Sequence, residues 1–99
     1  DLVRSRGLGD VYKRQIVTSD TSVATGLRIV YWIAVSAGST GGAFQINDST
    51  DDSGTDKINL TVAANTTLFI DLSHAPLELK EGLYVDVPGT NVTVNVGYR

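Results

Sequence analysis

Four aspartates lie close together in the segment 48–56 and form the densest group of possible metal ligands in the sequence. They are Asp48, Asp51, Asp52 and Asp56. An EF-hand calcium loop needs oxygen ligands at alternating positions, glycine at the sixth position and glutamate at the twelfth. Counted from Asn47, those two positions hold Asp52 and Ile58, and a count from Asp51 fails in the same way. We therefore interpret the segment as a solvated turn and expect no cofactor, with a calcium site of another kind as the alternative.

His74 is the only histidine, and Asp71 and Ser73 lie beside it in the sequence. A serine hydrolase needs a histidine oriented by a carboxylate next to an activated hydroxyl. The chain has no G-x-S-x-G nucleophile turn. A glycosidase would need two carboxylates across a cleft, and a domain of this size has little room for one. The candidates for that pair are Asp71, Glu78, Glu81 and Asp86. We expect that the protein is not an enzyme and has no catalytic residues.

Aromatic side chains are a further candidate, because flat rings can bind sugars. Trp32, Tyr31 and Tyr84 are available, and packing in a core or an interface is the favoured role for each. The most apolar segment, LRIVYWIAVS at 27–36, contains two of them. Alternation places Leu27, Ile29, Tyr31, Ile33 and Val35 on one face, and Arg28, Val30, Trp32, Ala34 and Ser36 on the other. Because both faces are mostly apolar, we expect cover on both sides. The predicted interface residues are Trp32, Tyr31, Val30 and Ile33.

The elements that would position these residues are short strands. Apolar alternation predicts strands in the segments 16–26, 27–36, 43–47, 57–63, 66–72, 82–87 and 92–98. The segment 73–81 is predicted as a loop that Leu77 and Leu79 anchor. Turn signals recur every eight to twelve residues, and the chain shows no helical period. The sequence thus predicts an all-β fold, a single small antiparallel β-sandwich that is jelly-roll-like and has six to seven short strands.

The first 15 residues, DLVRSRGLGDVYKRQ, resemble a translated sequencing-library adapter. Asp10 to Gln15 can be encoded by GAT GTG TAT AAG AGA CAG, which resembles the end left by a tagmentation transposase, and the residues before them fit the adapter arm. Such scars are excluded from fold reasoning. We therefore predict that residues 1–15 are not part of the fold, that 16–99 is the β-sandwich domain, and that its true N-terminus is missing.

Charge and size narrow the function further. The full chain has a net charge of −3, and residues 16–99 alone carry −5, because residues 1–15 hold four basic and two acidic residues. No phosphate-binding stripe remains, so nucleic-acid binding is disfavoured. No apolar run is long enough for a membrane-spanning helix. Without cysteine, a domain this small often gains stability by oligomerising. We expect a homo-oligomer, with a trimer favoured.

From Ile16 to Arg99 the order of elements resembles a family of small β-sandwich proteins from tailed phages. The resemblance rests on IVTSDTSVATG before the strand LRIVYWIAV, on DSTDDSGTDKI at 48–58, on GLYV at 82–85 and on the final VTVNVGYR. Trp32 departs from the pattern. The resemblance implies a non-catalytic virion component, a capsid decoration or a tail or fibre module, that binds other virion proteins and is assembled in the host cytoplasm. A carbohydrate- or ligand-binding module of a larger protein is the alternative.

Overall fold

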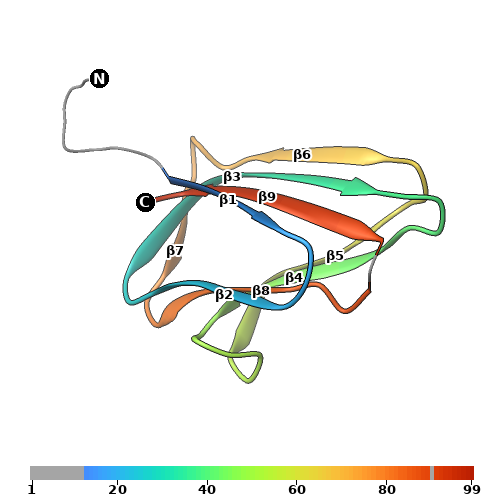
Figure 1. The fold of residues 1–99 in the computed structure, drawn as a ribbon. Coiled ribbons are helices and arrows are strands. Elements are labelled where there is room, and N and C mark those ends of the chain that lie inside the picture. The colour runs from blue at the N-terminus through green and yellow to red at the C-terminus, as the bar shows by residue number, and fades with distance from the viewer. Residues whose placement is uncertain (1–12, 90) are drawn as a thin grey trace.

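The computed structural model describes residues 13–89 and 91–99. The described residues form nine strands in two antiparallel sheets and contain no helix. Sheet A contains β1 (Lys13–Val17), β9 (Val92–Tyr98), β3 (Arg28–Ala37) and β6 (Thr67–Asp71) in that order, and β7 (Leu77–Leu79) pairs with the start of β3. Sheet B contains β2 (Thr21–Thr25), β8 (Gly82–Asp86), β4 (Gly42–Asp48) and β5 (Thr55–Val62). The two sheets form two layers (Figure 1).

This strand order is that of a jelly roll, in which two four-stranded sheets enclose one core. The predicted all-β sandwich class is therefore confirmed. The strand count is higher than the six or seven expected, for two reasons. The segment 16–26 crosses from sheet A to sheet B and forms two strands, β1 and β2. The segment 73–81, predicted as a loop, contains the short strand β7, whose Leu79 is fully buried.

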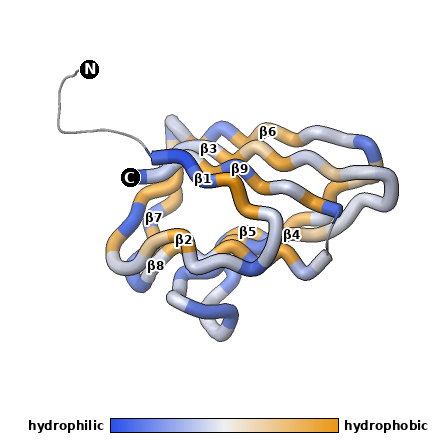
Figure 2. Tube along the Cα trace, viewed as in Figure 1, coloured by the Kyte–Doolittle hydropathy of each residue, from blue (hydrophilic) through white to orange (hydrophobic). Residues whose placement is uncertain are grey.

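Alternating apolar side chains from both sheets fill the core. Along β9, Val92, Val94, Val96 and Tyr98 all point inward, as the alternation predicts. Phe44 and Ile46 of β4 and Leu83 and Val85 of β8 meet them from sheet B. Figure 2 shows apolar residues alternating with polar ones along the strands and the polar loop between β4 and β5.

A β-bulge in β3 changes the expected facing of its residues. The pairing with β9 is regular up to Val30 and resumes at Trp32, which leaves Tyr31 as the extra residue. A one-residue insertion moves every preceding side chain to the opposite face. Val30 is therefore buried beside Ile33 and Val35, whereas Leu27 is 70% exposed. The face assignment predicted for residues 27–30 is wrong for this reason.

Strand β1 begins at Lys13, three residues before Ile16. Lys13, Arg14 and Gln15 pair with Tyr98, Gly97 and Val96 of β9, and their own side chains are exposed. Strand pairing uses backbone groups that every residue other than proline carries, so it does not depend on these side chains. The adapter origin of residues 1–15 stays a prediction, and residues 1–12 lie outside the described part of the chain.

Candidate functional site

The outer face of sheet A is a regular grid of side chains that point away from the core. Directly opposed residues of paired strands share a face, so the pairing defines three rows across β1, β9, β3 and β6. The first row is Arg14, Gly97, Trp32 and Asp71; the second is Ile16, Asn95, Ala34 and Phe69; the third is Thr93, Ser36 and Thr67. We call this grid the outer A face.

Trp32 lies over Gly97 in the first row. A Cβ atom at Gly97 would collide with Cε2 and Nε1 of the Trp32 indole. Gly97 has no side chain, yet it is buried, because the indole covers it. An aromatic side chain placed over a strand glycine in this way compensates for the missing side chain. Trp32 thus covers β9 and is held in place by it.

Phe69 extends the aromatic surface onto the edge strand β6. Its ring stacks against the Trp32 indole with centroids 6.2 Å apart and an angle of 25° between the planes. Phe69 is nevertheless 61% exposed, and Ile16, at the other end of the second row, is 64% exposed. Two large apolar side chains are thus open to solvent at opposite edges of one face.

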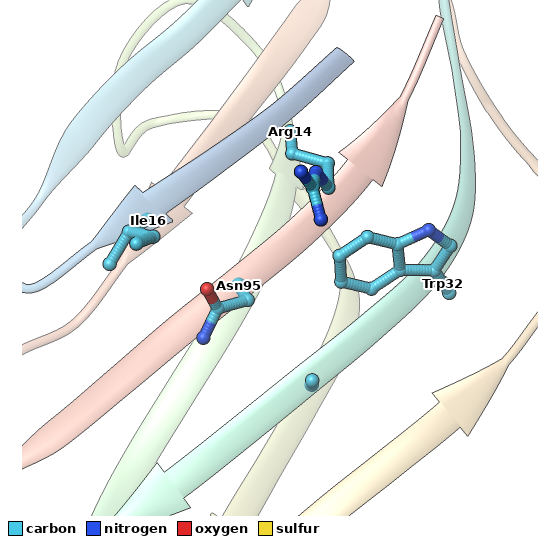
Figure 3. A pocket seen from close by; sticks show the side chains of 5 residues that line it. Arg14, Ile16, Trp32 and Asn95 are labelled. Carbon is cyan, nitrogen blue, oxygen red and sulfur yellow. The ribbon is translucent and has the colours of Figure 1, made fainter. Parts of the chain in front are cut away.

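A shallow hollow lies between Trp32 and the β1 edge. It has a volume of about 490 Å³ and is lined by Arg14, Ile16, Trp32, Ala34 and Asn95. Figure 3 shows the side chains of Arg14 and Trp32 converging over β9 from the strands on either side. Arg14 belongs to the segment predicted to be a translated adapter, so only the other four lining residues would be present in a native chain without that segment.

The four predicted interface residues lie in different environments in the structure. Val30 and Ile33 are fully buried in the core, so they are not available to a partner and that part of the prediction is wrong. Tyr31 lies in the bulge, where the Arg99 guanidinium is 5.8 Å from its ring centroid. Only Trp32 lies on the outer A face. Phe69 was not among the predicted interface residues, although the alternation of Leu68, Ile70 and Leu72 places it on the opposite, outward face of β6.

The acidic segment 48–56 is held together by its own hydrogen bonds. The Asp48 carboxylate accepts the backbone N–H groups of Lys80 at 3.0 Å, Glu81 at 2.7 Å and Gly82 at 3.4 Å. Partial desolvation alone would raise the pKa of Asp48, but these three hydrogen bonds outweigh it and lower the pKa below 3.8. Asp48 therefore ties the β4–β5 loop to the turn before β8.

Asp51 has a similar local role. Its carboxylate accepts hydrogen bonds from the Ser53 hydroxyl and N–H and from the Ser49 hydroxyl, which lowers its pKa. Such contacts are those of a turn residue. In the described part of the chain no three Asp, Glu, His or Cys side chains are placed to hold a metal ion.

Two of the other carboxylates considered for catalysis, Asp71 and Asp86, are separated by the fold. Asp71 lies on the outer A face, where the side chain and backbone N–H of Ser73 hydrogen-bond to it and lower its pKa. Asp86 lies on β8 in sheet B, on the other side of the sandwich. Burial raises the pKa of Asp86, and a hydrogen bond with the neighbouring Asp20 carboxyl raises it further. Asp71 and Asp86 cannot flank the same sugar ring.

Comparison with protein-family models, with curated proteins and with solved structures yields no match to this chain. Within the described residues, no helix has the length and hydropathy needed to cross a membrane.

Proposed function

We propose that this protein is a non-catalytic structural protein of a tailed-phage virion, a capsid decoration or a tail or fibre module. It acts by self-association and by docking on other virion proteins through the outer A face. The observation that carries the proposal is the exposure of Ile16 and Phe69 on either side of Trp32. Large apolar side chains that are exposed together on one face are typical of interaction sites.

The positions of the acidic side chains also favour docking through the outer A face. From Ile16 onward the chain has nine acidic residues. Only Asp71 lies in the three rows of the outer A face, and Glu78 of β7 is exposed beside them on the same sheet. The acidic β4–β5 loop projects from the side of sheet B (Figure 1). Docking through the outer A face therefore requires little desolvation of charge, which is expensive for unpaired groups. Nucleic acid and membrane are not among the partners proposed.

The jelly roll agrees with this function but does not carry it. Viral capsid domains, lectins and cupins share this architecture, and one fold hosts many functions. The resemblance of residues 16–99 to small phage β-sandwich proteins points to the virion among these. Assembly would take place in the host cytoplasm.

The test is to resequence the native locus from the source DNA, through residue 16 and across the neighbouring genes. We expect a different N-terminal sequence in place of residues 1–15 and neighbours that encode capsid, portal or tail proteins. Metabolic or secretory neighbours would contradict the virion proposal. Persistence of DLVRSRGLGDVYKRQ would contradict the adapter origin.

A carbohydrate-binding module is the second candidate, and the hollow beside Trp32 favours it. Its volume of about 490 Å³ lies within the range of about 300–1,000 Å³ of small-molecule sites, which combine apolar walls with a few polar groups. Trp32 supplies the flat wall and Asn95 the amide. Because Trp32 is the only tryptophan, its fluorescence reports binding directly. Saturable quenching by a sugar, lost in Asn95→Ala and kept in Leu27→Ala, would establish this function.

A further inference from the structure

We propose that the occupant of the outer A face is a second copy of this chain, bound face to face about a two-fold axis that runs close to the strand direction. The inference rests on the proposed function and specifies the partner used in self-association. Its basis is that the face carries an exposed ring and a hollow on opposite sides of Trp32. Phe69 is exposed on the β6 side, where it stacks against Trp32, and the hollow lies on the β1 side.

A two-fold axis along the strands exchanges the two edges of each row. A residue at the β1 edge then faces the residue that ends the same row at the β6 edge of the partner. Ile16 therefore meets the partner's Phe69, and Asn95 meets the partner's Ala34. The ring of Phe69 enters the hollow of the other copy, and the same contact forms a second time in the opposite direction. Such self-complementarity is what a two-fold interface requires.

The charges of the face agree with this arrangement. The first row begins with Arg14 and ends with Asp71, so each arginine would face the aspartate of the other copy. Arg14 is within the predicted adapter, so a native chain without residues 1–15 would lack this charge pair. The second row has no charged residue and would remain in a native chain. Two copies, each with a net charge of −3, meet here with their acidic loops directed away from each other.

The geometry of packed sheets fits as well. Aligned sheets pack about 10 Å apart with their strands at about 30°, which places the axis about 15° from the strands. Four strands about 4.8 Å apart and three rows about 6.8 Å apart give a flat patch of about 400 Å² per copy. The total of about 800 Å² is below the roughly 1,200–2,000 Å² of stable interfaces. The pair is therefore weak and forms at high concentration. It closes as a dimer, in contrast to the trimer expected from the sequence.

Cysteine cross-linking tests the arrangement, since the chain has no cysteine of its own. In the proposed pair, residue 14 lies about 10 Å from residue 71 of the other copy, whereas two residues 71 are about 17 Å apart. A mixture of Arg14→Cys and Asp71→Cys proteins, both of which keep Ile16 and Phe69, should give several-fold more dimer with a short bis-maleimide than either variant alone. Leu27→Cys mixed with Asp71→Cys is the matched control, because Leu27 is 70% exposed and lies outside the grid.

Equal yields from all mixtures, a predominance of the 71–71 product, or trimers and larger products would overturn the two-fold pair. The absence of any cross-linked product would do the same. The thermal melt of each variant, followed by circular dichroism, verifies that it is folded before cross-linking. The locus test of the virion role is independent of these outcomes, so the inference can fail while the proposed function stands.

Discussion

The contact between Trp32 and Gly97 leads to a prediction whose sign depends on a single side chain. Within a strand, glycine is less favourable than alanine by about 0.5–1 kcal/mol, so the backbone preference by itself would make Gly97→Ala stabilising. The new methyl group, however, would collide with the indole, and overpacking costs about 1–3 kcal/mol. We expect a net loss of about 1 kcal/mol, which lowers the Tm by about 4–8 °C for a domain of this size.

In a Trp32→Ala background the collision is absent, and the same Gly97→Ala change should raise stability by about 0.5 kcal/mol. The four proteins of this double-mutant cycle are compared by urea unfolding followed by far-UV circular dichroism, which does not depend on the tryptophan. Gly89→Ala is the control, since the nearest atom to its new Cβ is 4.0 Å away. A Gly97→Ala effect of the same sign and size in both backgrounds would refute the proposed packing of Trp32 over β9.

Three further predictions concern the loops, the acidic pair and the bulge. Asp48→Ala should lower the free energy of unfolding by about 1–2 kcal/mol at pH 7, because three backbone donors lose their acceptor at an exposed site. The stability of the wild type should fall as the pH drops below 3.8, since the Asp48 pKa is lowered on folding. Urea titrations at several pH values measure both effects. For Asp86, whose pKa is raised on folding, the stability it contributes is complete below 3.8 and is lost as the pH rises through the raised pKa. Asp86→Asn should flatten that decline in a plot of Tm against pH, and an unchanged slope would contradict the coupling to Asp20. Val30→Ala should lower the free energy of unfolding by about 2 kcal/mol, because it creates a cavity. Leu27→Ala should change the same quantity by less than about 0.5 kcal/mol. A larger loss for Leu27→Ala than for Val30→Ala would disprove the bulge at Tyr31.

Local alternation predicts most of this fold because each strand buries one face. The segments 82–87 and 92–98 show it clearly, and Leu83, Val85, Val94 and Val96 are fully buried, as expected. The same logic fails in β3. A bulge depends on how β3 pairs with β9, which lies more than 60 residues further along the chain, and no pattern within 27–36 reveals it.

The candidate site could be predicted only in part. Trp32 stands out in the sequence, but its contact with Gly97 depends on tertiary pairing. Phe69 was within reach of sequence analysis, because its neighbours alternate, yet its proximity to Trp32 depends on the pairing of β6 with β3. The hollow combines residues of β1, β9 and β3, which only the jelly-roll order of sheet A brings together.

The central claim is that the outer A face binds a second copy of this chain, and the most direct measurement is sedimentation equilibrium of the full chain from about 10 µM to about 1 mM. We predict that the average mass rises toward that of a dimer, that Phe69→Ser keeps the protein monomeric, and that Leu27→Ser associates like the wild type. A wild-type protein that stays monomeric throughout, or a Phe69→Ser variant that associates as strongly as the wild type, would contradict the claim.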